Sequence, residues 1–259
     1  MKHTFIHGER DGIIIFIHGN SSSSNVFQHI LNSKKIMRSM LAVDLPGHGS
    51  SLNGYNREEN FFMGSYLDQL YDLIQNIDED IVLVGNSLGG HIAIELAPRI
   101  KDKLKGLVIF GTPPLKKPLN FEEAFLPEPA LQTFFTENPP DNEIKEAANI
   151  AVFDKLNAPI VVENFKKAHP KVRTALGVDV ANERLLNEYE IFTNLTIPKY
   201  IIAGLQDPTI NRDYLNHVVD ASAGHCELIE FKDCGHYPSL EQPLQFEATL
   251  SRIANEVFK

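Results

Sequence analysis

The chain lacks the residues that mark several protein classes. Tryptophan is absent, and only two cysteines, Cys226 and Cys234, occur among 259 residues. Two cysteines cannot supply the bridges of a small disulfide-rich protein, so we expect two reduced, packed thiols. The longest strongly apolar run, Ile13 to Ile17, is far shorter than the roughly 20 residues that cross a bilayer. No membrane partner is therefore expected.

Basic charge is also scarce, because 24 Lys and Arg face 34 Asp and Glu, which gives a formal net charge of −10. A surface of that sign repels phosphate backbones, so no nucleic-acid partner is expected. Residues 1–7 hold no apolar core of the kind that a secretory signal has, and we expect a cytoplasmic protein. With 43% apolar residues, the composition is that of an ordinary globular fold.

Short runs rich in Ile, Val and Leu recur between helical patterns. The runs are nearly continuous, which is typical of strands buried on both faces of a parallel sheet. The predicted strands are Ile13–Ile17, Met40–Val43, Ile81–Gly85, Leu107–Gly111, Lys199–Ala203 and Glu227–Phe231. The predicted helices are Phe61–Gln75, Leu88–Arg99, Asp213–Val219 and Pro243–Glu256. This order predicts an α/β fold with a mainly parallel sheet flanked by helices.

One region, residues 113–195, interrupts this alternation. It contains many prolines and no convincing buried strand, yet it is too long and too apolar to be a plain loop. We therefore predict a core made of residues 1–112 and 196–259, with 113–195 as a helical cap inserted over it. A set of extra packing helices without a gating role is the alternative. Four phenylalanines of this region are candidate substrate contacts: Phe121, Phe125, Phe134 and Phe135.

A serine flanked by glycines follows the third predicted strand, in the sequence Gly-Asn-Ser-Leu-Gly-Gly at 85–90. A sharp strand-to-helix turn crowds the backbone around its central residue, so small residues are needed two positions to either side. Gly85 and Gly89 supply them. The turn would lift the Ser87 hydroxyl above the sheet at a helix N-terminus, where the helix dipole favours developing negative charge. We therefore predict Ser87 to be a nucleophile.

A serine hydroxyl needs a neighbouring base, and one of the ten histidines is placed to serve as one. His236 follows the last predicted strand, at the sheet edge where ligands and catalytic groups gather. Asp207 occupies the corresponding loop after the preceding strand. The order serine, acid, histidine predicts Ser87 as nucleophile, Asp207 as acid and His236 as general base. Asp233 is nearer to His236 in sequence, but such adjacency usually points the two side chains apart.

Acyl transfer at a serine also needs amide donors for the oxyanion. The first predicted strand leads into His18-Gly19-Asn20-Ser21, again at a strand carboxyl end. We predict that the backbone N–H groups of Asn20 and Leu88 form the oxyanion hole. A second glycine-rich loop, Asp44–Gly49, follows the next strand, and we expect it to brace the first loop rather than to react.

These loops together resemble the α/β-hydrolase superfamily over nearly the whole chain outside the insertion. Finer features, namely the His18–Ser23 loop, the Ser87–His91 turn and Gly111-Thr112-Pro113-Pro114, are similar to the metal-independent N-acyl-homoserine lactone hydrolases. The resemblance implies a serine nucleophile, an acid before a proline, and a helical cap over an acyl pocket. That family often has a Trp before its nucleophile and a glutamate as acid, where this chain has Asn86 and Asp207.

The predicted function is cleavage of a carboxylic ester or lactone that carries an apolar group, without cofactor or metal, by a monomer or homodimer. The turn at Ser87 also resembles that of carbon–carbon hydrolases of ring-cleavage products. Those enzymes typically place a Trp after the catalytic histidine, where this chain has Tyr237. A ligand-binding receptor that retains the three residues and scarcely turns over is the other alternative, because geometry rather than residue identity sets the rate.

Overall fold

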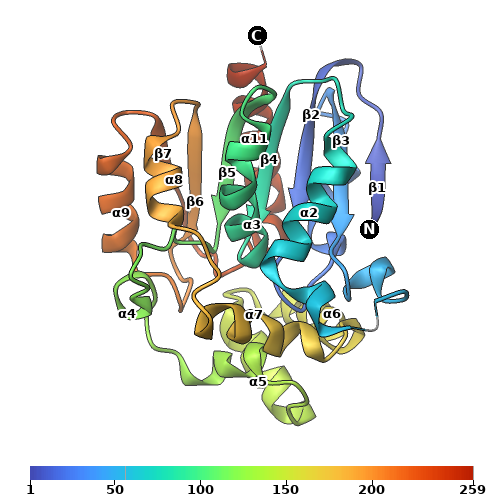
Figure 1. Ribbon diagram of the computed structural model, residues 1–259, viewed down its shortest axis with the longest axis vertical. Helices are drawn as coiled ribbons and strands as arrows, with labels where there is room; N and C mark the ends of the chain where they lie inside the picture. The colour runs from blue at the N-terminus through green and yellow to red at the C-terminus, as the bar shows by residue number, and fades with distance from the viewer. Residues whose placement is uncertain (56, 259) are drawn as a thin grey trace.

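The computed structural model describes residues 1–55 and 57–258 (Figure 1). Its centre is a seven-stranded sheet with the order β1-β3-β2-β4-β5-β6-β7. Strands β2 to β7 run parallel to one another, and β1 pairs with β3 in the antiparallel direction. The strands are β1 (Lys2–Ile6), β2 (Arg10–Ile17), β3 (Arg38–Asp44), β4 (Ile81–Asn86), β5 (Leu104–Phe110), β6 (Lys199–Gly204) and β7 (Cys226–Phe231).

Both faces of the sheet are buried. In β2, Ile13, Ile15 and Ile17 join one apolar cluster, whereas Ile14 and Phe16 join the other. Successive side chains of a strand point to opposite faces, so a continuous apolar run is what a strand covered on both sides requires. The mainly parallel sheet flanked by helices is therefore confirmed.

Helices cover the two faces of the sheet, with α2, α3 and α9 on one side and α11 on the other (Figure 1). The α-helices are α1 (Gln28–Leu31), α2 (Met63–Ile74), α3 (Leu88–Leu96), α4 (Phe121–Ala124), α5 (Asp141–Ala151), α6 (Ala158–Lys167), α7 (Lys171–Ala181), α8 (Glu188–Asn194), α9 (Arg212–Ala221), α10 (Pro238–Glu241) and α11 (Pro243–Val257). Short 3-10 helices are η1 (Ser24–Phe27), η2 (Gly49–Ser51), η3 (Glu58–Phe61), η4 (Ala97–Ile100), η5 (Pro129–Phe135) and η6 (Lys155–Asn157).

All six predicted strands are present, and each extends one to three residues beyond one or both of its predicted ends. Strand β1 was not predicted, because Lys2–Ile6 is an edge strand with mostly exposed side chains and no apolar run. Within the described ranges, no helix is long and apolar enough to cross a membrane.

The chain between β5 and β6 folds as helices, and we call residues 121–194, from α4 to the end of α8, the inserted segment. Helices α5, α6 and α7 lie beyond the carboxyl ends of the parallel strands (Figure 1). That edge also holds the loops that follow β2, β4, β6 and β7. The topology therefore brings the inserted segment next to every loop that carries a predicted site residue.

Candidate active site

Ser87 occupies a strained turn between β4 and α3. Its backbone has φ 50° and ψ −122°, in a region that side chains other than glycine rarely adopt. A Cβ on Gly85 would lie 2.4 Å from the carbonyl oxygen of Gly89, and a Cβ on Gly89 would lie 2.1 Å from that of Ile17. The two glycines are thus required by close backbone packing, as the sequence predicts.

The backbone of Ser87 is held by the neighbouring strand. Its N–H donates to the Phe110 carbonyl at 2.9 Å, and the Thr112 hydroxyl donates to the Ser87 carbonyl at 2.8 Å. These bonds come from the end of β5 and the residues after it. They fix the turn in the conformation that its positive φ makes unfavourable in isolation.

His236 and Asp207 form a close pair. Nδ1 of His236 lies 2.8 Å from Oδ2 of Asp207, with side-chain exposures of only 14% and 5%. Because the carboxylate accepts, Nδ1 carries the proton, and Nε2 is left with its lone pair. Thr209 donates to the other Asp207 oxygen from its N–H at 3.0 Å and from its hydroxyl at 2.6 Å. The acid is thus fixed on both oxygens.

The two groups perturb each other's ionisation. Burial opposes charge on Asp207, but the charge and hydrogen bond of His236 and the bonds from Thr209 hold the Asp207 pKa below its usual value. Burial likewise lowers the pKa of His236, and the negative charge and hydrogen bond of Asp207 more than offset this, so the His236 pKa is raised. Both shifts favour an ion pair once His236 accepts a proton.

The loop that carries His236 contacts the loop that carries Ser87. The side-chain amide of Asn86 donates to the carbonyl oxygens of Phe110 at 3.3 Å and His236 at 3.4 Å. Gly111 adopts φ 61°, and a Cβ there would lie 2.7 Å from Cε1 of His236. The structure therefore brings the predicted nucleophile, acid and base to one edge of the sheet, with the imidazole packed against bare backbone.

The predicted oxyanion donors border this site. A Cβ on Gly19 would lie 3.0 Å from the Ser87 Cβ, so the loop after β2 passes directly against the serine. Leu88 begins α3, and the first N–H groups of a helix have no partner inside it. In the described part of the chain, neither the Asn20 nor the Leu88 amide donates a hydrogen bond to the protein. The Asn20 side chain instead donates to the Phe134 carbonyl at 3.0 Å.

Two buried histidines brace the loop that carries Asn20, as expected for the second glycine-rich loop. The Leu45 amide donates to Nε2 of His18, and the Ser21 amide donates to Nε2 of His48, each at 3.0 Å. Burial lowers the pKa of His18, and lowers that of His48 well below its usual value. Both rings are therefore neutral acceptors that join the loops after β2 and β3 rather than reactive groups.

The four predicted phenylalanine contacts occupy different surroundings. Phe121 and Phe135 are 37% and 48% exposed. Phe125 pairs through its backbone with Ile210 in the acid loop, residues 205–211. The Phe134 ring packs edge-on against Phe165 at 5.6 Å. Their contact with a substrate stays a prediction.

Sequence reasoning missed two buried carboxylates near the site. Glu188 accepts from Nδ1 of His91 at 2.7 Å and from the Leu115 amide at 3.0 Å, which joins α8 to the helix after Ser87. Glu241, in α10, lies beside the histidine loop, residues 232–237. Glu188 binds groups 97 and 73 positions away, and Glu241 also binds the Phe153 amide, 88 positions away, so no local pattern revealed these partners.

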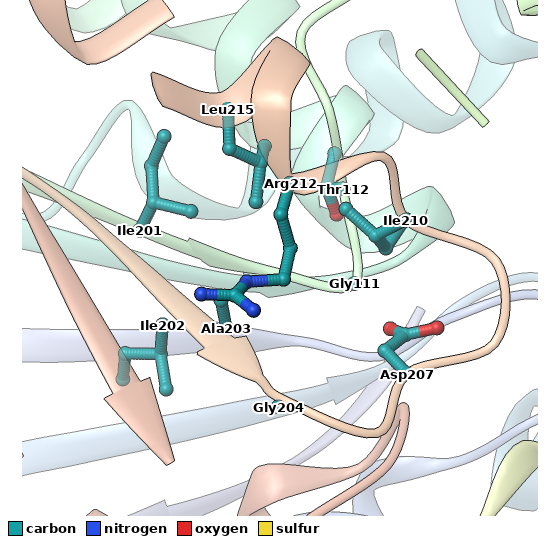
Figure 2. Close-up of a pocket in the computed structure, with 10 residues that line it drawn as sticks. All are labelled: Gly111, Thr112, Ile201, Ile202, Ala203, Gly204, Asp207, Ile210, Arg212 and Leu215. Carbon is teal, nitrogen blue, oxygen red and sulfur yellow. The ribbon is translucent and has the colours of Figure 1, made fainter. Parts of the chain in front are cut away.

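A cavity of about 10 Å³ lies beside the acid loop, and its volume suits a single water. Figure 2 shows the Asp207 carboxylate at one side of it and the side chains of Ile201, Leu215 and Arg212 at the other. Arg212 is paired with Glu230. Among the described residues, no group of three or more His, Cys, Asp or Glu side chains could hold a metal ion. Cys226 and Cys234 are free thiols, as predicted.

A sequence model of the alpha/beta hydrolase family matches residues 14–249, and the chain belongs to this family. It is 26% identical over 262 residues to a protein named as an esterase/lipase of Mycoplasma genitalium, covering 95% of this chain and 91% of that one. A protein of the same name from Mycoplasma pneumoniae is 30% identical over 133 residues, and this chain spans only 46% of its length.

Among solved structures, a mutant of N-acyl homoserine lactonase AidH complexed with N-hexanoyl homoserine lactone superimposes with a TM-score of 0.85. The two chains are 25% identical, and the superposition covers 98% of this chain and 93% of the lactonase. The predicted α/β-hydrolase fold and the resemblance to N-acyl-homoserine lactone hydrolases are thereby confirmed.

Proposed function

We propose that this protein is a serine hydrolase that cleaves a carboxylic ester or lactone through an acyl-enzyme. The observation that carries the proposal is the 2.8 Å pair of His236 and Asp207, on loops that meet the strained turn of Ser87. In this proposal Ser87 is the nucleophile, His236 the general base and Asp207 the acid. The relatives named as esterase/lipase and lactonase support the same reaction class.

The reaction begins when Nε2 of His236 takes the proton from the Ser87 hydroxyl, whose oxygen attacks the carbonyl carbon. Amides of Asn20 and Leu88 donate to the oxyanion, and each donor contributes about 3–4 kcal/mol of transition-state stabilisation. Collapse breaks the ester C–O bond, and His236 gives its proton to the departing alcohol. Water then gives a proton to His236 as its oxygen attacks the acyl carbon. The bond between that carbon and the Ser87 oxygen breaks, and His236 returns the proton to Ser87. In a lactone, the alcohol remains attached, and the product is a hydroxy acid.

The inserted segment gives the proposal its substrate preference. We propose residues 113–195 as a cap over a core of residues 1–112 and 196–259. Phe125 touches the acid loop, and the Phe134 carbonyl binds the Asn20 side chain, so the segment adjoins both sides of the site. Together with Phe121 and Phe135, these rings suit a small substrate with an apolar acyl or ring group.

The test compares wild-type protein with Ser87→Ala on p-nitrophenyl esters of graded chain length, N-acyl-homoserine lactones and a vinylogous ring-cleavage diketone. We expect Ser87-dependent hydrolysis of an ester or lactone, and a loss of about 10⁴-fold or more in kcat for the variant. Ser251→Ala is the matched control, because the buried Ser251 hydroxyl in α11 has no hydrogen-bond partner among the described residues.

Other outcomes separate the alternatives. Turnover that survives Ser87→Ala would contradict the proposed nucleophile. Cleavage of the diketone alone would favour a carbon–carbon hydrolase. Tight binding of a lactone or ester without turnover would favour a receptor.

A further inference from the structure

One buried carboxylate joins the histidine loop to the inserted segment. Glu241 ends α10 and is 7% exposed. Its Oε1 accepts from the amides of Gly235 at 3.0 Å and Tyr237 at 3.2 Å. Its Oε2 accepts from the amides of Phe153 at 2.6 Å and Asp154 at 3.1 Å. The first two amides flank His236, and the last two follow α5 of the inserted segment.

The same two stretches of backbone also touch directly. The His236 amide donates to the Ala151 carbonyl, at the end of α5, at 2.8 Å. A Cβ on Gly235 would lie 2.6 Å from that oxygen and 3.1 Å from Oε1 of Glu241. The amides of three successive residues, Gly235, His236 and Tyr237, are therefore all fixed by Glu241 or by Ala151.

The chemistry of these contacts suits a stable link between the two stretches of backbone. A carboxylate removed from water is costly unless hydrogen-bonded, and here four neutral N–H donors supply those bonds. The negative charge of Glu241 also acts on the imidazole of His236. Burial lowers the pKa of His236, whereas the negative charges of Asp207 and, more weakly, Glu241 raise it. Glu241 thus acts on the position and on the proton affinity of the ring without facing the reacting atoms.

We propose that Glu241 is a positioning residue for the general base, which fixes the backbone on both sides of His236 and couples it to residues 151–154 of the inserted segment. This inference rests on the proposed function, because it gives His236 the role of base. It adds that the inserted segment helps to assemble the base in addition to covering the substrate.

The test uses a fluorophosphonate probe, which needs no knowledge of the natural substrate. The Ser87 oxygen forms a bond to phosphorus, the phosphorus–fluorine bond breaks, and His236 takes the serine proton. The second-order labelling rate is measured against pH for wild type, Glu241→Gln and Glu241→Asp. Glu247→Gln is the matched control, because Glu247 is a 5% exposed carboxylate of α11 that binds Ser33 and Lys35.

We expect Glu241→Gln to label about 10- to 100-fold more slowly, because displacing the His236 imidazole by about 1 Å from its working position slows the reaction by that order. The Glu247→Gln labelling rate should stay within twofold of wild type. The acid limb of the rate profile should move to lower pH in Glu241→Gln, since one negative charge near His236 is lost. Glu241→Asp keeps the charge, so its acid limb should match wild type while its rate falls by at least threefold.

The possible outcomes distinguish failure of the proposed function from failure of the positioning role of Glu241. Absence of labelling at Ser87 in wild type, read from the mass of the tryptic peptide, would contradict the proposed function. Normal labelling of wild type with an equal rate and pH profile in folded Glu241→Gln would overturn the positioning role alone. Should Glu241→Gln fail to fold, Glu241→Asp decides, because a wild-type rate in that variant overturns the proposal.

Discussion

Ser87 and His236 lie at the same edge of the sheet but are held there by different parts of the molecule. Ser87 is fixed by the core: Phe110 and Thr112 bind its backbone, and neighbouring glycines allow the close backbone packing around its turn. His236 is bonded to the core through Asp207 and to the inserted segment through Ala151. The proposed nucleophile is thus positioned by the local geometry of its turn, and the proposed base by contacts with two regions of the molecule.

Because of this difference, substitutions in the two regions are expected to have different effects. A change within the core turn alters the strand packing on which the whole fold depends. A change where the inserted segment contacts the histidine loop is expected to affect the position of His236 more than the stability of the fold. Stability and reactivity, measured together, therefore show which region a substitution has affected.

The largest expected effect is on the proposed base, His236, through the proposed acid, Asp207. Asp207→Asn removes the negative charge that orients His236 and stabilises its protonated form, and we expect kcat to fall by about 10⁴-fold. The acid limb of kcat/KM should also move to lower pH, because Asp207 raises the pKa of His236. Asp233→Asn is the control: that carboxylate is exposed and sits at φ 51°, which Asn tolerates. Equal losses in both variants would contradict the assignment of the acid.

A pair of glycine substitutions tests the comparison directly. Gly89→Ala forces a Cβ to within 2.1 Å of the Ile17 carbonyl in a central strand, and we expect a loss of about 3 kcal/mol in unfolding free energy. In Gly235→Ala the new Cβ would lie 2.6 Å from the Ala151 carbonyl oxygen, and we expect a loss of about 1–2 kcal/mol in unfolding free energy. In folded protein, Gly235→Ala should also label slowly with the fluorophosphonate. Urea titration measures both energies, and a larger stability loss in Gly235→Ala would reverse the comparison.

A pH effect on stability is expected where α3 meets the end of the inserted segment. Burial and the negative charge of Glu188 raise the pKa of Glu95 to about 7, and its carboxylate accepts from the Leu186 amide. The folded state therefore binds this proton more tightly than the unfolded state. The stability gained from that proton is present below pH 4.5 or so and is lost as the pH rises through 7.

Glu95→Gln removes the titrating carboxyl group and with it the loss of stability at high pH. The Gln side chain keeps an oxygen that can accept from the Leu186 amide. Its unfolding free energy relative to wild type should rise between pH 5 and pH 8 by on the order of 3 kcal/mol. Glu163→Gln, at an exposed pair with Lys167, is the control and should show no such rise. A pH-independent difference for Glu95→Gln in urea titrations would contradict the shifted pKa.

The smallest expected effect concerns the exposed part of the inserted segment. Phe135 is 48% exposed, so Phe135→Ala should change the unfolding free energy by no more than about 0.5 kcal/mol. If its ring contacts the acyl group, KM for long-chain esters should rise about fivefold with kcat unchanged, which corresponds to about 1 kcal/mol of lost apolar contact. Leu156 of the inserted segment is 84% exposed and is not a predicted substrate contact, so Leu156→Ala is the control. An unchanged KM would remove Phe135 from the predicted substrate contacts.

The sheet and the site loops were predictable because their signals are local. Continuous apolar runs identify strands buried on both faces, and the parallel order places the loops after them at one edge. Strand β1 gave no such signal because its side chains are mostly exposed. The partners of Glu188 and Glu241 could not be read from the sequence, since Glu188 meets His91 and Glu241 meets Phe153 across 97 and 88 positions.

Anchors along the inserted segment divide it into shorter closed loops. Leu126 donates to the Thr209 carbonyl, residues 151–154 bind the histidine loop and Glu241, and Glu188 binds His91. Each such link reduces the freedom of the chain between the fixed points, as a cross-link does in a polymer. A movement that preserves these bonds is confined to residues 127–150 and 155–187. Both stretches are tied to the core again, where the Phe134 carbonyl accepts from the Asn20 side chain and the His169 amide donates to the Gly47 carbonyl. A rearrangement of this kind leaves in place the backbone atoms that fix His236, namely those of residues 151–154 and 235–237.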